Sequence, residues 1–145
     1  MGEAREQFLR QNDFRVADYS APTYTIKILG VPLRFPNTKA HRWATPLHDL
    51  HHLLTGYRTD WIGEAEVAAW ELRAGCKTLV VYWLDLSGVA IGLFLSPVRV
   101  WRAFRRARGQ RTLYREPELR ETMMQMSVGD MRSRLGIPPG GLVRR

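Results

Sequence analysis

The apolar segment formed by residues 79–95 constrains the fold more than any other feature of the chain. A helix that crosses a bilayer needs about 20 apolar residues, and a charge near its centre is costly. This segment is shorter and is interrupted by Asp85, Ser87, Gly88 and Gly92. We therefore predict two buried helices that meet near Gly88 rather than a membrane span.

Size and composition indicate one globular domain, residues 1–145, because 45% hydrophobic and 25% charged residues are ordinary values. A chain of this length can bury a core without disulfides or metals, so a bound metal would serve function. Cys76 is the sole cysteine, which excludes an internal disulfide and a cysteine-based zinc cluster. A charged N-terminus without an apolar signal stretch predicts a cytoplasmic protein.

Turn and capping residues divide the first half of the chain into short elements. Residues 4–10 predict a helix, and "TYTIKILGVPLRF" predicts a hairpin around Gly30. Thr45 followed by Pro46 is typical of a helix start, and Gly56 would end that helix.

Similar signals predict further helices in the second half. A helix capped by Thr59 or Asp60 would follow, and Pro97 would begin a basic helix. "EPELRETMMQM" and "VGDMRSRLG" predict two more. The predicted fold is mainly α, a compact helical domain of about six or seven helices with a small N-terminal β-hairpin.

The motif "HDLHH" suggests a metal site. His48 and His52 are four residues apart and would share one face of a helix, where Asp49 lies beside them. Nitrogen and oxygen ligands of this kind suit zinc, and also iron, manganese or other divalent ions. By spacing alone, His51 is as good a ligand as Asp49, and a packed or surface histidine pair is the ordinary alternative.

A single helix rarely completes such a site, so a further ligand is expected from the next helix. The turn "TGYRTD" reverses the chain and would place Glu64 opposite His52. Glu66 and Glu71 are competing acids on the same helix. Asp60 could instead accept a hydrogen bond from an imidazole N–H.

These residues resemble the signature of the ubiquinone (coenzyme Q) biosynthesis protein Coq-four family: His-Asp, two residues, His, eleven residues, Glu. The matching positions are His48, Asp49, His52 and Glu64. "LLTGYRTDWIGEAEVAAWE", "SPVRV" and "RLGIPP" also resemble the family in the same order, so the resemblance covers residues 40–140. Residues 1–39 diverge because a hairpin replaces the family's helix. The missing mitochondrial leader suggests a short bacterial-type member.

The resemblance implies an all-helical fold and one divalent metal ion on the four signature residues, zinc first, with iron, manganese or magnesium as alternatives. It implies a lyase that removes the C1 carboxylate of a polyprenylated hydroxybenzoate-like precursor, in some accounts with oxidation of that carbon. The alternative is a non-catalytic prenyl-lipid-binding or scaffold protein of a quinone biosynthetic complex. The implied partners are a prenylated aromatic or isoprenoid ligand, other quinone-biosynthesis proteins, the membrane surface and, as an option, a second copy.

Three side chains near the motif are candidates for acid–base catalysis: Asp60, Tyr57 and His51. Each has an ordinary alternative. Asp60 would be a helix cap, Tyr57 a packed aromatic and His51 a solvated histidine.

An arginine-rich segment, residues 99–111, carries much of the net charge of +8. Beside an apolar segment it would suit anionic lipid at the inner face of the membrane, although core packing and a solvated helix face are the alternatives. Nucleic acid ranks last because no nucleic-acid fold pattern is present. The candidate lipid and membrane residues are Trp83, Phe94, Arg99, Trp101, Arg102, Phe104, Arg105 and Arg106.

Overall fold

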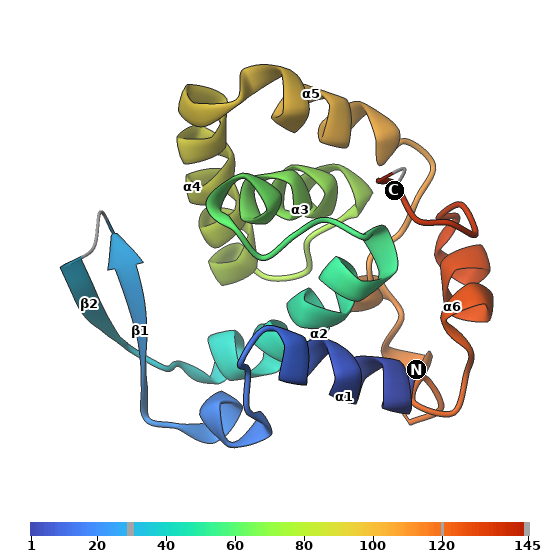
Figure 1. Cartoon of the computed structure of the whole chain (residues 1–145), viewed down its shortest axis with the longest axis horizontal. Helices are drawn as coiled ribbons and strands as arrows, with labels where there is room; N and C mark the ends of the chain where they lie inside the picture. Colours follow the sequence, from blue (N-terminus) through green and yellow to red (C-terminus); the bar gives the residue numbers. More distant parts are fainter. Residues whose placement is uncertain (29–30, 120, 144–145) are drawn as a thin grey trace.

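The computed structural model describes residues 1–28, 31–119 and 121–143, and over these residues the chain is mainly helical (Figure 1). Six α-helices, three short 3-10 helices and one hairpin are present there, which confirms the predicted fold class. The α-helices are α1 (Gly2–Gln11), α2 (Lys39–Thr55), α3 (Trp61–Ala74), α4 (Leu79–Leu95), α5 (Pro97–Arg106) and α6 (Val128–Leu135). The 3-10 helices are η1 (Val16–Ser20), η2 (Leu113–Arg115) and η3 (Pro117–Leu119).

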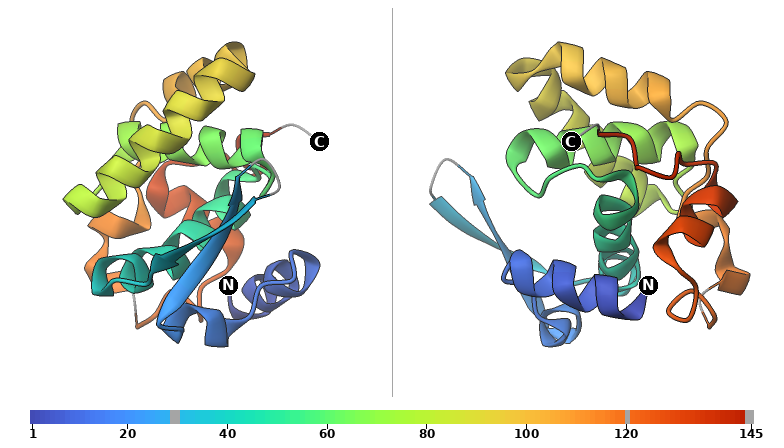
Figure 2. Two further views of the ribbon diagram at one scale, coloured as in Figure 1. Left: turned by 90° about the vertical axis from the view of Figure 1, so that its left-hand side faces the viewer. Right: turned by 45° about the vertical axis from the view of Figure 1, so that its right-hand side comes forward.

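The hairpin predicted from the β-branched and aromatic residues is present. Strands β1 (Thr23–Ile28) and β2 (Val31–Pro36) pair antiparallel from Thr23 opposite Pro36 to Ile28 opposite Val31. Their connection, including Gly30, lies outside the described residues. The right-hand view of Figure 2 shows the hairpin extending from the helical body, so the all-helical expectation fails for this segment.

Helix α2, which carries the histidine motif, begins earlier than predicted. Thr38 is its N-cap, and the hydroxyl of Thr38 accepts a hydrogen bond from the backbone N–H of His41. Pro46 therefore lies inside the helix, not in its first turn, and the predicted start at Thr45 is wrong. The earlier start extends the helix by residues 39–45, which lets it bury Ala44. Gly56 ends α2 as predicted, in a left-handed conformation with φ of 83°.

Helices α3 and α4 pack closely because their facing residues are small. Asp60 caps α3, its carboxylate accepting from the N–H of Gly63. A Cβ atom at Gly92 would lie 2.2 Å from the Cβ of Ala65, and one at Gly88 would lie 3.2 Å from the Cβ of Ala68. The glycines therefore allow close approach and do not break α4, so the predicted pair of helices is wrong.

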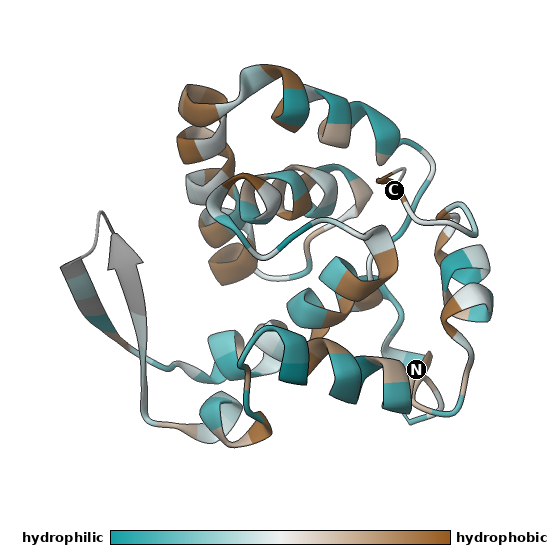
Figure 3. Cartoon of the chain, viewed as in Figure 1, coloured by the Kyte–Doolittle hydropathy of each residue, from teal (hydrophilic) through white to brown (hydrophobic). Residues whose placement is uncertain are grey.

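Helix α4 buries a narrow stripe and leaves most of its apolar side chains exposed, which corrects the prediction of two buried helices. Val81, Asp85 and Gly92 are its buried residues. Leu79 and Phe94 are 78% and 91% exposed, and much of the ribbon of this helix is coloured as hydrophobic in Figure 3. No helix among the described residues has both the length and the apolar character needed to span a bilayer.

The segments that follow α5, with η2 and α6, pack against α2 along one side of the molecule (Figure 1). Ser127 caps α6, and Gly136 ends it. The helix expected over residues 116–126 is not continuous: the described part contains η3 followed by turns. The core lies between α2, α3, α5 and these segments, with Trp70, Tyr114 and Met131 fully buried.

Candidate metal centre

The structure brings together three of the four signature residues. The ligand atoms of His48, His52 and Glu64 all lie within 4.8 Å of one another. Nε2 of His48 is 3.0 Å from Oε2 of Glu64, and Nε2 of His52 is 3.3 Å from Oε1 of the same carboxylate. The two Nε2 atoms are 3.2 Å apart. Helix α2 supplies both imidazoles from one face, and the first turn of α3 supplies the carboxylate.

The outer nitrogen of each imidazole already has an acceptor. Nδ1 of His52 is 3.1 Å from the backbone carbonyl of Tyr57, which can only accept, so this nitrogen carries the hydrogen. Nδ1 of His48 is 3.0 Å from Oε1 of Glu71 and donates to that carboxylate. With both Nδ1 atoms occupied as donors, each ring directs Nε2 toward Glu64, and an Nε2 without a hydrogen offers its lone pair there. Imidazoles oriented in this way are typical of metal ligands.

Charge within the cluster is strongly coupled. Burial alone would raise the pKa of Glu64, but the hydrogen bond from His48 and the charge of that imidazole outweigh it and hold that pKa well below its usual value. Burial alone would lower the pKa of His48, but Glu71 and Glu64 outweigh it and raise that pKa well above 6.5. A proton on His48 thus balances part of the negative charge in the metal-free protein.

Asp49, the remaining signature residue, lies beside this group but is not part of the three-residue cluster. Its Oδ2 accepts a hydrogen bond from the hydroxyl of Tyr19 in η1. Burial raises the pKa of Asp49, although the Tyr19 hydrogen bond and the nearby imidazoles oppose the shift. Its role as a fourth ligand therefore stays a prediction.

Glu71, which sequence reasoning treated as a competing acid, is a fully buried acceptor behind His48. Its Oε1 accepts from Nδ1 of His48, from Nδ1 of His51 at 2.5 Å and from the Tyr114 hydroxyl at 3.2 Å. Burial would raise its pKa, but His48 and His51 hold the pKa well below 4.5. Glu71 is therefore an ionised carboxylate that orients the His48 ring.

Asp85 in α4 was not singled out as a site residue, although it is the one acid in the apolar segment. Its carboxyl group lies within 4.8 Å of ligand atoms of His48 and Glu71, forming a second group of possible ligands. Burial, followed by the charge of Glu71, raises its pKa to about 9. Asp85 is thus protonated at neutral pH, and the first group is the better metal site because it offers two imidazoles and an ionised carboxylate, whereas Asp85 in the second group carries a proton.

The three acid–base candidates have structural roles. His51 is fully buried, so the prediction of a solvated histidine is wrong. Its Nδ1 donates to Glu71 and its Nε2 accepts from the N–H of Leu113 at 2.9 Å, so neither nitrogen is free. Asp60 caps α3 and pairs with Arg58 at 3.0 Å. Tyr57 is buried, and burial raises its hydroxyl pKa to about 12. None of the three lines the cavity beside the metal group.

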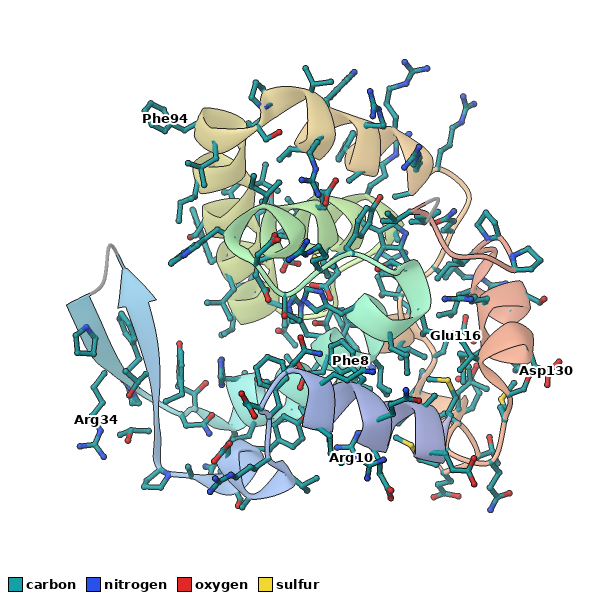
Figure 4. All side chains as sticks on the ribbon, viewed as in Figure 1. Phe8, Arg10, Arg34, Phe94, Glu116 and Asp130 are labelled. Carbon is teal, nitrogen blue, oxygen red and sulfur yellow. The ribbon has the colours of Figure 1, made fainter. Side chains whose placement is uncertain are left out.

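That cavity has a volume of about 420 Å³ and is lined by His48, Glu64, Asp49 and Asp85 together with mainly apolar groups. Its walls come from η1, the hairpin, α2, α3 and α4. On another side of the site, Phe8 of α1 points toward the middle of the molecule (Figure 4), and its ring stacks on His52 with centroids 6.3 Å apart. The other lining residues are Phe14, Arg15, Asp18, Tyr19, Tyr24, Thr25, Asn37, His41, Ala44, Thr45, Ala68, Val81, Leu84, Gly88 and Tyr114.

Of the residues expected to meet lipid, Phe104 is half-buried and the other seven are exposed. Arg99, Arg106 and Phe104 also have partners within the protein. Arg99 forms an ion pair with Glu66 at 2.6 Å, Arg106 donates to the carbonyl of Leu142 at 2.7 Å, and half-buried Phe104 stacks on Trp101 with Arg73 over its ring.

Comparisons with models of known protein families, with curated proteins and with solved structures find no match to this chain. The function of the chain is therefore inferred from the geometry of the site and from the motif in the sequence.

Proposed function

We propose that the chain binds one divalent metal ion, zinc as the first choice, between His48, His52 and Glu64. The observation that carries this is the pair of Nε2 atoms 3.2 Å apart, both facing a carboxylate while both Nδ1 atoms are occupied as donors. Two lone pairs and a carboxylate at this separation repel one another unless a cation lies between them. In the metal-free protein a proton on His48 meets this need, so metal binding should release a proton.

We propose further that the site acts on an aromatic acid, as the sequence motif implies. A bound divalent ion supplies a Lewis acid that can hold the substrate carboxylate. The cavity supports this reading because its volume of about 420 Å³ lies within the range of small-molecule sites and its walls are mainly apolar. The reaction would be removal of the ring carboxylate at C1: the carbon–carbon bond breaks, carbon dioxide leaves and a proton takes its place on the ring. The ring would carry a polyprenyl chain.

Native mass spectrometry of the full chain tests the metal site. Wild-type protein should retain one zinc ion, and His52→Ala should lose it because one imidazole ligand is removed. Asp49→Asn tests the fourth ligand, since zinc affinity falls if Asp49 binds the ion and is retained if Asp49 only accepts from Tyr19. Equal zinc content in wild type and His52→Ala would refute the site. The reaction is tested separately by supplying a polyprenylated hydroxybenzoate and measuring the release of carbon dioxide.

A second candidate function is prenyl-lipid binding or scaffolding at a membrane surface without catalysis. The exposed apolar side chains of α4 favour it, together with a groove of about 440 Å³ on α5 lined by Val98, Trp101, Arg102, Arg105 and Arg106. Apolar groups beside arginines are the pattern of helices that lie at anionic lipid surfaces.

Sedimentation with vesicles tests this surface. Wild type should bind phosphatidylserine-containing vesicles more strongly than pure phosphatidylcholine, and Arg102→Gln with Arg105→Gln should remove that preference. Arg10→Gln is the matched control, because Arg10 is a surface cation of α1. The side chains of Arg10 and of its partner Glu6 are 72% and 68% exposed. A prenyl lipid that remains bound in His52→Ala would support a carrier function over a lyase.

A further inference from the structure

His41 is held rigidly on the cavity wall, seven residues before the metal motif. Its ring stacks on Tyr24 with centroids 3.9 Å apart and planes at 8°. Nδ1 of His41 lies 2.9 Å from Oδ1 of Asn37. Asn37 is itself fixed, since its amide nitrogen donates to the carbonyls of Tyr19 at 3.2 Å and Ala21 at 2.8 Å.

These contacts determine the tautomer of His41. Because the Asn37 nitrogen donates to two carbonyls, its oxygen is the acceptor, and Nδ1 of His41 must carry the hydrogen. The Thr45 hydroxyl donates to the backbone carbonyl of His41. Its oxygen lies 3.3 Å from Nδ1 of His41 and is at most a second, weaker acceptor for the N–H that Asn37 accepts. Burial, with the charge of His48, lowers the pKa of His41. The ring is therefore neutral, with a lone pair at Nε2.

That Nε2 atom differs from its counterparts in the other three histidines. His48, His51 and His52 have partners at both ring nitrogens. Within residues 1–28, 31–119 and 121–143, no hydrogen-bond partner meets Nε2 of His41, yet the residue lines the same cavity as His48 and Glu64. A fixed acceptor without a protein donor, in the wall of a mainly apolar cavity, is suited to a donor on a ligand.

We propose that Nε2 of His41 accepts a hydrogen bond from a hydroxyl or amine group of the ligand that occupies this cavity. His41 would then determine specificity, selecting rings that carry a hydrogen-bond donor over ethers and unsubstituted rings. This inference rests on the proposed metal-dependent binding of an aromatic acid, and it adds a second point at which the protein recognises that acid.

Calorimetric titration of the zinc-loaded full chain tests the proposal, with benzoate, the hydroxybenzoates and the matching methoxybenzoates as probes. Wild type should bind a hydroxybenzoate about three- to tenfold more tightly than its methoxy counterpart, the usual effect of one hydrogen bond. His41→Phe keeps a ring to stack on Tyr24 and removes both nitrogens. It should abolish the preference, so that each hydroxybenzoate binds no more tightly than its methoxy counterpart.

The His41→Phe substitution leaves the buried Asn37 oxygen without its donor and so could disturb folding. A second measurement therefore uses the unmodified protein. In imidazole-nitrogen NMR, Nε2 of His41 should shift toward the hydrogen-bonded position when the preferred hydroxybenzoate is added. The proposal would be overturned if the Nε2 signal did not move in ligand-saturated protein or if the preference survived in His41→Phe. It would also be overturned if no hydroxybenzoate bound to the zinc-loaded protein. Loss of zinc binding itself would instead refute the proposed function.

Discussion

Replacing Glu71 with glutamine would test whether a buried carboxylate orients an imidazole of the proposed metal site. Glu71 is fully buried, and its Oε1 accepts from His48, His51 and Tyr114 at 3.0, 2.5 and 3.2 Å. Glutamine has nearly the same shape and keeps one acceptor oxygen but loses the charge. Hydrogen bonds to a charged group are roughly twice as strong as neutral ones, so each contact weakens.

The expected magnitudes follow from these contacts. Weakening each of the three hydrogen bonds by about 1 kcal/mol sets an upper limit of about 3 kcal/mol on the lost unfolding free energy. The variant no longer has to bury a charge, which offsets part of this loss. We therefore expect metal-free Glu71→Gln to lose about 1–3 kcal/mol of unfolding free energy. Loss of a partner behind a metal-binding histidine typically costs 10- to 100-fold in metal affinity, which is about 1.4–2.8 kcal/mol.

Competition with a chromophoric zinc chelator would measure the affinity, and urea unfolding would measure the stability. Glu66→Gln is the matched control: Glu66 lies on the same helix and is also buried, but its partner is Arg99, so stability changes while zinc affinity does not. Unchanged zinc affinity in folded Glu71→Gln would refute the orienting role of Glu71.

Three further results are expected. Gly92→Ala should lose about 1–3 kcal/mol in urea unfolding because its Cβ would lie 2.2 Å from that of Ala65, whereas Gly88→Ala, at 3.2 Å from Ala68, should change stability by less than about 1 kcal/mol. Burial, followed by the charge of Asp85, raises the pKa of the Cys76 thiol far above its usual value. Iodoacetamide at pH 8 should therefore modify Cys76 at least about tenfold more slowly in folded than in urea-unfolded protein, and equal rates would contradict this. Because the pKa of Asp85 is about 9 in the folded protein and about 3.9 when unfolded, folded metal-free protein retains an extra proton between these values. Its stability should fall as pH rises through that window, and Asp85→Asn should flatten the fall; parallel curves would count against the shift.

Local signals in the sequence were sufficient where neighbouring residues determine the structure. Asp60, Ser127, Gly56 and Gly136 act at helix ends as their chemistry predicts. The spacing of His48 and His52 was enough to place both imidazoles on one face. These features depend on contacts within one turn of helix, so sequence alone contains them.

Features that depend on distant contacts could not be predicted in the same way. Gly88 was interpreted as a helix break because its role, close approach to α3, exists only after packing. His51 has the spacing of a ligand, but Leu113, 62 residues later, occupies its free nitrogen. Asp85 contacts Cys76 and Glu71 from another helix. In the sequence, its position as a single acid among apolar residues is the feature that could indicate a functional role.

The end of the histidine-bearing helix depends on residues that follow it by about 80 positions. The guanidinium of Arg132 donates to the carbonyls of Leu53 and Leu54, and the N–H of Leu142 donates to the carbonyl of Thr55. During synthesis the ribosome would release α2 long before these donors emerge, and contacts of such long sequence separation form slowly. We therefore expect nascent chains that end before Arg132 to hold the ion poorly, so that loading would be a late event in the life of the newly made protein.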